Sequence, residues 1–551
     1  MKKNKYLLLA SSLGVFVLLA VAAVQENFLK DWRKIQATAK TEEGPVAVQL
    51  RQVINRGLNL SDRCTSCHVS MGPGEQNAAG PGVLTAHKPV VHDPAEYGCT
   101  VCHGGQGHAT EKDDAHGDVH FWPEPMIPVR LSYAGCGTCH IALNAPGRDG
   151  FRRARGAYER LDCAACHSMD GRGGLLRPDG GGMEGGDLSR TGISGYDREW
   201  YGKHLRQSQQ AARGPWKTSF APITQADLEL LATFLDTRVG APKLVEAKSV
   251  FLSSGCLGCH KTGAIGGDDG PELSLAGLKD PALMDFTHVP GKESVENWFT
   301  EHFRSPSGTV TGSLMPALHV PPEEMELLNF YLFSLRRRDV PVSFAPKDRV
   351  RALQFGEREF ATDGATIYGA FCSGCHGADG KGFRSPGMPA FPSISNPDLL
   401  ELVSDEFLIE TIRKGRPGRR MPGWDRDGGL RQPEILAVVG YLRQMSGVQA
   451  RPQPAPTQAL PGASAAGSRI YASACAGCHG PKGEGAAGPS LNNKVFLSIA
   501  TNAFLMETIG RGRRGTTMEG FRTPSPARQA LSDNEIASVV SFIRSWEGSK
   551  P

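Results

Sequence analysis

The first apolar stretch of the chain is long enough to cross a membrane. An almost unbroken apolar run extends from Tyr6 to Val24 and follows three lysines within the first five residues. In a helix this run rises about 28 Å, which matches the hydrocarbon core of a bilayer. The lysines predict a cytoplasmic N-terminus and an exported remainder. We expect residues 1–28 to form a single-pass anchor that Gln25–Lys40 continues as unbroken helix; a cleaved signal peptide is the alternative.

Apolar positions at helical spacing also occur at the ends of several segments further along the chain. In the last of these, Ser532 and Glu535 form a capping box before an apolar stripe from Ile536 to Ile543. Comparable stretches are Asp227–Leu235, Glu323–Leu335 and Glu434–Leu442. Gly (67) and Pro (38) are abundant, which favours short helices and loops over large sheets. The predicted fold class is therefore mainly α.

The candidate chemistry lies in the 14 cysteines, which all fall into seven C-x-x-C pairs, each followed directly by a histidine. C-x-x-C-H is the attachment sequence of c-type haem, in which the cysteines form two thioether bonds and the histidine is an axial iron ligand. Disulfides need no histidine after each pair, and zinc sites need a second ligand pair at matched spacing. We predict seven covalently bound c-type haems. The attachment cysteines are Cys64, Cys67, Cys99, Cys102, Cys136, Cys139, Cys163, Cys166, Cys256, Cys259, Cys372, Cys375, Cys475 and Cys478, and the proximal histidines are His68, His103, His140, His167, His260, His376 and His479.

The spacing of these motifs predicts two kinds of module. The first cysteines are 35, 37 and 27 residues apart as far as Cys163, and then 93, 116 and 103 residues apart. About 100 residues suffice to enclose one haem in a small helical domain, whereas about 35 do not. Haems 1–3 should therefore share a loop-rich triheme module, followed by four tandem cytochrome c-like helical domains for haems 4–7. The predicted boundaries are 1–28 (anchor), 29–155 (triheme module), 156–242 (haem 4), 243–345 (haem 5), 356–447 (haem 6), 448–468 (Pro/Ala-rich linker) and 469–551 (haem 7). The linker predicts a last domain that is free to move.

The charge balance excludes one class of partner. Lys plus Arg (61) nearly equals Asp plus Glu (57), and basic and aromatic residues are not interleaved, so we expect no nucleic-acid partner. The basic stretches Arg413–Arg420 and Arg511–Arg514 are expected to be solvated, with haem propionates or an acidic partner as alternatives.

The later units resemble the class I cytochrome c domain. After C-x-x-C-H, each carries a methionine ahead of its last amphipathic helix: Met315 in SLMPAL, Met421 in RRMPGW and Met518 in TTMEGF. The resemblance covers about residues 245–340, 356–447 and 466–548, and 156–240 less well. It implies small all-α domains closed by their first and last helices, with these methionines as distal ligands. It also implies that the carbonyls of Pro271 and Pro489, in G-P-x-L, steady the proximal histidines.

The haem-4 unit departs from this pattern. Its Trp200 and His204 match a Trp-x-x-x-His pair in the next unit, but counting forward from His204 to the methionine position gives Lys217, and Gly186 occupies the proline position. We take Lys217 as the distal candidate, with Met183, His204 or an open coordination position as alternatives.

Five further histidines lie among the first three motifs, where three are needed for bis-histidine ligation. We favour His87, His92 and His116. The remaining alternatives are His108, His120, Met71 and Met126. Over about residues 29–150 the chain resembles the N-terminal part of anchored multihaem c subunits that accompany b-type cytochromes in bacterial quinol-oxidising complexes. The motifs that carry this resemblance are Asp62-Arg63-Cys64, Gly104-Gly105-Gln106-Gly107, Ala115-His116-Gly117 and Trp122-x-x-Pro125-Met126.

Together these features predict a redox wire on the periplasmic side of the cytoplasmic membrane. Because one transmembrane helix cannot build a quinone site, we expect a b-type cytochrome or another polytopic quinol-oxidising subunit as the donor. A soluble cytochrome or a terminal oxidase is the expected acceptor. An electron-transfer subunit is favoured over an independent enzyme. The alternatives are a haem-based reductase or oxidase acting at an open haem 4, and an extracellular electron conduit.

Overall fold

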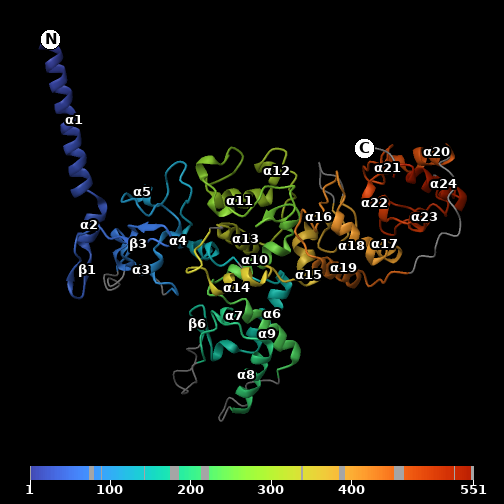
Figure 1. Cartoon of the computed structure of the whole chain (residues 1–551), viewed down its shortest axis with the longest axis horizontal. Coiled ribbons are helices and arrows are strands. Elements are labelled where there is room, and N and C mark those ends of the chain that lie inside the picture. The colour runs from blue at the N-terminus through green and yellow to red at the C-terminus, as the bar shows by residue number, and fades with distance from the viewer. Residues whose placement is uncertain are drawn as a thin grey trace.

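The computed structural model of the chain describes residues 2–72, 80–87, 90–141, 143–173, 185–211, 223–336, 339–383, 391–451, 465–526 and 528–547. The molecule is elongated, with the N-terminal helix at one end and the last helical domain at the other (Figure 1). The domain that contains α6–α9 projects to one side of this line (Figure 1). The chain is mainly α, as the sequence predicts. The described strands form antiparallel two-stranded ribbons only: β1 (Lys40–Thr41) with β2 (Gly44–Pro45), β3 (Val53–Asn55) with β4 (Leu60–Asp62), β5 (Ser168–Met169) with β6 (Arg172–Gly173), and β7 (Lys261–Thr262) with β8 (Ile265–Gly266).

The apolar N-terminal stretch forms helix α1 (Lys2–Phe28), whose described side chains are all exposed. Among the described helices it is the one long and apolar enough to span a bilayer. The predicted unbroken continuation through Lys40 is wrong, because Lys30 has extended backbone angles and α2 (Asp31–Thr38) begins after it. The change of direction lets Gln36 reach the triheme module, where its Nε2 donates to the Ser66 carbonyl at 2.8 Å.

The region predicted as the triheme module, residues 29–155, begins with short elements that have little apolar core of their own. One small buried cluster, Ala39, Val46 and Val69, lies within it, whereas Ile127, Leu131 and Ala134 near its end join the core of the helical domains. The described helical elements are η1 (Cys64–Ser66), η2 (Val69–Met71), η4 (Gly82–Leu84), α3 (Pro94–Tyr97), α4 (Thr100–His103), α5 (Lys112–Ala115) and η5 (Val129–Thr138). The first motif begins in η1, the second lies around α4, and the third lies at the end of η5.

Four helical domains follow, each closed by packing its first helix against its last. An aromatic pair marks each closure, with ring centroids 4.6–5.5 Å apart: Tyr158–Phe234, Phe251–Tyr331, Tyr368–Tyr441 and Tyr471–Phe542. The haem-4 domain contains α6 (Arg148–Arg160), α7 (Thr191–Ser194), α8 (Arg198–Ala211) and α9 (Gln225–Asp236), and the haem-5 domain contains α10 (Leu244–Ser253), η9 (Cys256–Gly258), α11 (Val295–Arg304), α12 (Pro306–Thr309) and α13 (Pro322–Ser334). The haem-6 domain contains α15 (Gly364–Ile367), η12 (Tyr368–Cys372), α16 (Ser373–His376), α17 (Pro397–Leu402), α18 (Asp405–Lys414) and α19 (Gln432–Ser446). The haem-7 domain contains α20 (Ala465–Ala474), α21 (Ala476–His479), α22 (Lys494–Ile499), α23 (Asn502–Arg511) and α24 (Asp533–Arg544).

Two helices extend across the domain and linker boundaries that the sequence predicts. Helix α6 begins at Arg148, so it crosses the predicted boundary at residue 155, and α20 begins at Ala465, inside the predicted linker. A further helix, α14 (Lys347–Phe355), connects the haem-5 and haem-6 domains. The predicted capping box of the last helix is present, since Ser532 and Glu535 bond reciprocally.

Candidate haem sites

Each C-x-x-C-H motif folds into about one helical turn, which brings its three side chains to one side. The His68 N–H donates to the Cys64 carbonyl at 2.9 Å, and His479 does the same to Cys475 at 3.0 Å. Residues at i, i+3 and i+4 of such a turn share a face. The local fold therefore presents two sulfurs and an imidazole together, as covalent haem attachment requires.

In the four helical domains a main-chain carbonyl orients the proximal imidazole. The Nδ1 atoms of His167, His260, His376 and His479 lie 2.8–2.9 Å from the carbonyls of Gly186, Pro271, Pro392 and Pro489, respectively. An Nδ1–H bond leaves Nε2 as the iron ligand. Pro271 and Pro489 are the residues that the class I resemblance implies, and Gly186 occupies the proline position of the haem-4 unit, which departs from that pattern. Pro392 was missed, because it follows Phe391 and lacks the G-P-x-L pattern.

Four proximal histidines face a second histidine across a short gap. The ring centroids are 6.2–6.5 Å apart in the pairs His68–His116, His103–His87, His140–His92 and His167–His204. A metal held at about 2 Å by two opposed imidazole nitrogens separates the ring centroids by roughly 6 Å. The four pairs therefore fit bis-histidine ligation of haems 1–4.

The predicted ligands of the triheme module are thus brought to individual sites: His116 to site 1, His87 to site 2 and His92 to site 3. In the described part of this module, His108 and His120 are exposed and pair with no proximal ring. Burial lowers the pKa of His140 to about 4, with a contribution from His92. Burial lowers the pKa values of His68 and His103 as well. Such shifts keep imidazole neutral, which is the form that binds a metal.

Site 4 contains a distal candidate that differs from the preferred one. His204 faces His167 and stacks on Trp200 at 4.9 Å with an angle of 5° between the planes. Lys217 and Met183 lie outside the described residues. Among the described side chains, His204 is therefore the one placed to complete this site.

The haem-5 domain holds two candidates near its proximal histidine. Met315, the predicted ligand, is partly buried against the core. His302 stacks on Trp298 at 4.6 Å, as His204 does on Trp200, and its buried Nδ1 has no hydrogen-bond partner. Burial and neighbouring His260 lower the pKa of His302 to about 4. Sequence matching paired the two Trp-His sets, but nothing in it identified His302 as a second candidate.

The last two domains hold their predicted methionines in matching loops. The Arg416 N–H donates to the Met421 carbonyl at 2.8 Å, and the Arg513 N–H donates to the Met518 carbonyl at 2.7 Å. Both loops follow the G-R-x-G sequence, so the repeat seen in the sequence corresponds to a repeated hairpin-like support for the methionine.

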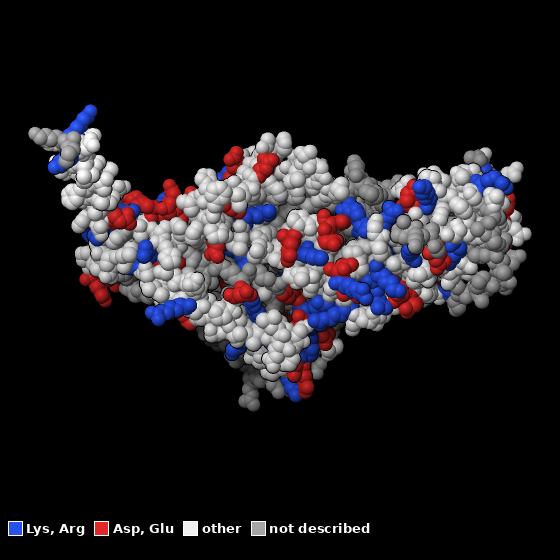
Figure 2. All heavy atoms as spheres, turned by 45° about the horizontal axis from the view of Figure 1, so that its top comes forward, with Lys and Arg blue, Asp and Glu red and all other residues white. Residues whose placement is uncertain are grey.

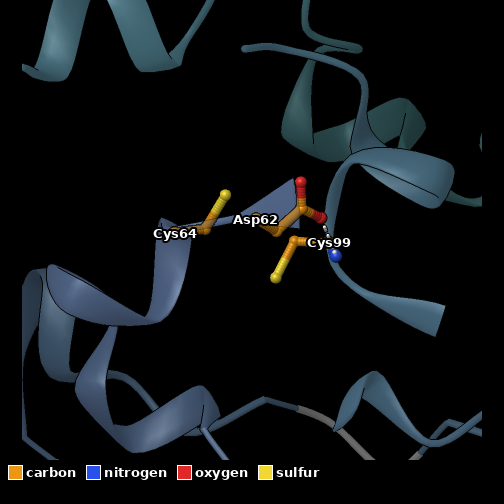
Figure 3. Close-up of side chains that lie close together, drawn as sticks. All are labelled: Asp62, Cys64 and Cys99. Carbon is orange, nitrogen blue, oxygen red and sulfur yellow. Dashed lines mark hydrogen bonds between the residues drawn. The ribbon is translucent and has the colours of Figure 1, made fainter. Parts of the chain in front are cut away.

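Neighbouring motifs touch along the triheme module. The Asp62 carboxylate accepts bonds from Cys99 N, Thr100 N and Thr100 Oγ1 at 2.6–2.8 Å, and it lies with the Cys64 and Cys99 sulfurs within 4.8 Å (Figure 3). Both sulfurs belong to predicted haem-attachment cysteines, and the carboxylate already accepts three hydrogen bonds. We therefore interpret this group as a contact that joins sites 1 and 2 rather than as a metal centre. A Cβ added at Gly135, just before motif 3, would lie 1.8 Å from the Cys102 carbonyl oxygen of motif 2.

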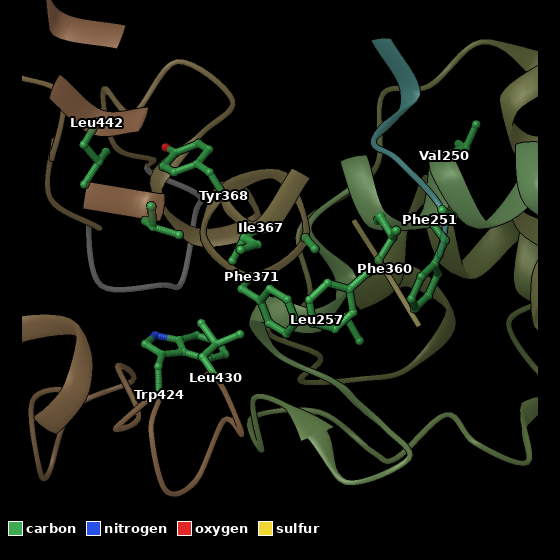
Figure 4. Packing of buried hydrophobic residues seen from close by; sticks show 14 of the residues in the cluster. Val250, Phe251, Leu257, Phe360, Ile367, Tyr368, Phe371, Trp424, Leu430 and Leu442 are labelled. Carbon is green, nitrogen blue, oxygen red and sulfur yellow. The ribbon is translucent and has the colours of Figure 1, made fainter. Parts of the chain in front are cut away.

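A second close contact joins motifs 5 and 6. The sulfurs of Cys259 and Cys375 are 3.9 Å apart. A Cβ at Gly255 would lie 2.3 Å from Gly374 N, so glycine is needed for this approach. Leu257, from motif 5, lies beside Phe371 of the haem-6 domain, and Phe360 completes the group (Figure 4).

Site 3 adjoins both the haem-4 and the haem-5 domains. A cavity of about 730 Å³ is lined by Cys136, Cys139 and His140 from motif 3 and by Cys163 and His167 from motif 4. Residues 244–336 of the haem-5 domain contribute nothing to its described lining. On the other side of motif 3, a Cβ at Gly137 would lie 2.3 Å from the Ser334 carbonyl oxygen of α13.

The two arginine-rich stretches are largely paired within the chain. Lys414 contacts Glu410 at 2.6 Å, Arg420 contacts Asp269 at 2.7 Å, and Arg514 contacts Asp398 at 2.7 Å. Basic and acidic groups are interspersed over the face shown in Figure 2. These contacts favour a role within the chain over an open basic docking surface.

The last two domains match known families. Residues 464–547 match the model for "Cytochrome c", and residues 359–442 match "Cytochrome C oxidase, cbb3-type, subunit III". Together with the C-x-x-C-H motifs, these matches define the chain as a c-type cytochrome with two cytochrome c domains near its C-terminus.

Curated relatives are similar over about a third of the chain. The chain is 34% identical over 198 residues to a Cbb3-type cytochrome c oxidase subunit FixP of Bradyrhizobium sp. (strain ORS 278), covering 34% of this chain and 61% of the relative. It is 30% identical over 197 residues to the subunit CcoP of Rhodobacter capsulatus, covering 34% and 62%. The chain thus spans about three fifths of these relatives. A chain of the Kuenenia stuttgartiensis reducing HAO-like protein complex matches 33% of this chain and 94% of its own length with 21% identity, but its TM-score of 0.23 is too low to bear on the fold.

Proposed function

We propose that the chain is a heptahaem c-type cytochrome that carries electrons from a quinol-oxidising membrane partner to an acceptor on the periplasmic side. Bound haem supplies reversible one-electron chemistry at iron. The observation that carries the proposal is the succession of contacts between attachment motifs: Cys64 with Cys99, Cys102 with Gly135, and Cys259 with Cys375. Residues that hold neighbouring haems in contact favour electron hopping between them.

The ligand sets give this succession a direction. Opposed histidines occupy sites 1–4, and methionines are the candidates at sites 6 and 7. Methionine ligation raises the reduction potential of haem relative to two histidines. Electrons therefore move from the sites next to α1 towards the C-terminal domains. The lysines before α1 support a cytoplasmic N-terminus, with the haem domains outside.

The proposed route differs from motif order at one point. Motif 3 shares a cavity with motif 4 and packs its Gly137 against α13 of the haem-5 domain. The haem-4 domain therefore forms a side arm of the route rather than a step between sites 3 and 5. The pairing of His204 with His167 also disfavours an open iron there, and with it a reductase acting at haem 4.

The test begins with haem counting and partner identification on the full-length protein. Mass spectrometry of the mature chain is expected to find seven attached haems. Solubilisation in mild detergent is expected to retain a b-type cytochrome and quinol-dependent reduction. Fewer than seven haems, or a solitary monomer without quinol-dependent reduction, would overturn the proposal. A fully low-spin spectrum that cyanide does not change would support the closed site 4.

A second candidate rests on the similarity of the C-terminal domains to cbb3-type oxidase subunits. In this alternative the chain delivers electrons to an oxygen-reducing membrane complex of which it is a subunit. Copurification of cytochrome c oxidase activity, without a b-type quinol-oxidising subunit, would favour this candidate over the first.

A further inference from the structure

Site 3 differs from the four later sites in what orients its proximal histidine. Sites 4–7 place a main-chain carbonyl 2.8–2.9 Å from Nδ1. At site 3, Nδ1 of His140 lies 4.0 Å from Oδ1 of Asp348. His140 is 6% exposed and Asp348 is 4% exposed.

The other groups described within reach of this pair are the backbone N–H groups of Asp348 and Arg349 at the start of α14. Nδ1 of His140 and both carboxylate oxygens of Asp348 are buried, and no described side chain other than the opposite member of the pair is placed to bond to them. A buried polar group without a partner is costly, so two such groups facing each other indicate a bond between them. A movement of roughly 1 Å brings the pair to normal hydrogen-bond length.

In a haem site, His140 would be the hydrogen-bond donor of this pair and Asp348 would be the acceptor. With Nε2 on iron, the neutral imidazole of His140 carries its proton on Nδ1 and donates it to the carboxylate. Asp348 lies in the first turn of α14, where free N–H groups stabilise a negative charge. Burial raises the pKa of this carboxyl, and the backbone N–H groups together with the charges of Arg351 and Arg349 oppose that shift.

We infer that Asp348 is a positioning residue of haem 3, which acts through His140 to lower the reduction potential of that site. An anionic acceptor makes imidazole a stronger donor to iron and favours the ferric form more than a neutral carbonyl does. Site 3 then has the lowest potential among the bis-histidine sites. This position matters because motif 3 borders both the haem-4 cavity and the haem-5 domain. The inference rests on the proposed bis-histidine site of His140 and His92.

The first test is Asp348→Asn in the full-length holoprotein, with each midpoint potential resolved by spectroelectrochemical titration. The amide keeps an acceptor oxygen but removes the charge, so one low-spin haem should shift to a higher potential. Glu324→Gln is the matched control. Glu324 is 2% exposed and accepts from Arg148 and Arg152, so its buried carboxylate has arginine partners rather than a proximal histidine. An unchanged set of potentials in Asp348→Asn, or an equal shift in Glu324→Gln, would overturn the inference.

A second test does not depend on folding of the Asp348 variant. His92→Ala removes the distal ligand of site 3 and converts that haem to a high-spin form, which labels its transition. The transition that disappears from the low-spin set should be the one with the lowest potential. Loss of any other transition would refute the role of Asp348. Mass spectrometry separates this failure from failure of the proposed function, because it shows whether haem 3 is attached.

Discussion

The predicted triheme module and the last two domains arrange their haem-attachment motifs in opposite ways. In the module, three motifs lie between Cys64 and His140, and the opposed histidines come from loops between them. His116, which faces His68, lies beyond motif 2 in the chain. In the last domains, each motif has its own helix pair, its own proline carbonyl and its own methionine loop.

The difference lies in what supplies the core. The buried apolar residues of the helical domains form one continuous cluster, which Ile127, Leu131 and Ala134 of the predicted triheme module join. The earlier described part of that module has a separate cluster of Ala39, Val46 and Val69. A small segment with little apolar burial needs covalent or metal-linked support to be stable. We therefore expect bound haem to contribute more to the stability of the predicted triheme module, and side-chain packing to contribute more to that of the last two domains.

Truncating a core side chain should therefore separate the two regions most clearly. Ile536 is fully buried on α24, and Ile536→Ala should lower the unfolding free energy of the last domain by about 2–5 kcal/mol. Val69 is equally buried in the triheme module, but Val69→Ala removes only two carbons, worth about 1.6 kcal/mol. Denaturant unfolding of the holoprotein, followed by haem absorbance, measures both. A larger loss at Val69 than at Ile536 would contradict this view of the two cores.

The sequence predicts which residue types form each site better than it predicts which residues lie together in space. The motifs, the helix pairs and the carbonyls of Pro271 and Pro489 follow local patterns, so they could be predicted. Which of His87, His92 and His116 serves which iron depends on how loops fold back, and no local pattern records that.

Longer-range features were beyond any local signal. Counting along the loop after His204 predicts Lys217 for haem 4, whereas helix α8 places His204 opposite His167. Asp348 reaches His140 from a helix two domains further along the chain, and the contact of Gly255 with Gly374 joins separate domains. Such juxtapositions follow from domain packing.

Exchanging a ligand type tests whether the two regions differ in potential for the proposed reason. Met518→His should lower the potential of haem 7 on the order of 100 mV, or about 2.3 kcal/mol for one electron, within the roughly 0.8 V that axial ligands span. Redox titration would measure the shift, and the absorption band of methionine-ligated ferric haem should be lost. The control is Met506→Leu on α23, which leaves the ligand in place. If Met506→Leu causes the same shift, or Met518→His causes none, Met518 is not the ligand.

The polar contacts that join neighbouring sites should also differ between the two regions in how much they stabilise the protein. Asp62 is 1% exposed and bonds to both Cys99 N and Thr100 N, so Asp62→Asn should destabilise the triheme module by about 2 kcal/mol. The comparison is Asp398→Asn in the haem-6 domain, whose partner Arg514 is largely exposed and whose loss should have a smaller effect. Thermal unfolding followed at the haem absorbance compares them. Equal losses would mean that burial does not distinguish the two joints.

The smallest effect is expected where the last two domains meet. Asn396 donates to the Arg514 carbonyl at 2.9 Å, and Asn493 donates to the Pro417 carbonyl at 3.1 Å, so each domain contributes an equivalent bond. These contacts dock the domain that the linker predicts to be mobile. Each asparagine also caps a helix through its side-chain oxygen.

Serine separates the two roles of these asparagines, because it caps a helix about as well but is too short to reach the other domain. Asn396→Ser and Asn493→Ser should each weaken domain docking by about 1 kcal/mol, and the double variant by about twice that. Hydrogen exchange at residues 396–400 and 493–497 should stay protected, whereas small-angle scattering should show a more extended C-terminal pair. Unchanged scattering in the double variant would mean that other contacts, such as Phe407 with Phe504 at 5.4 Å, hold the domains together. In that case packing, rather than polar pairing, would govern this joint as it governs the cores beside it.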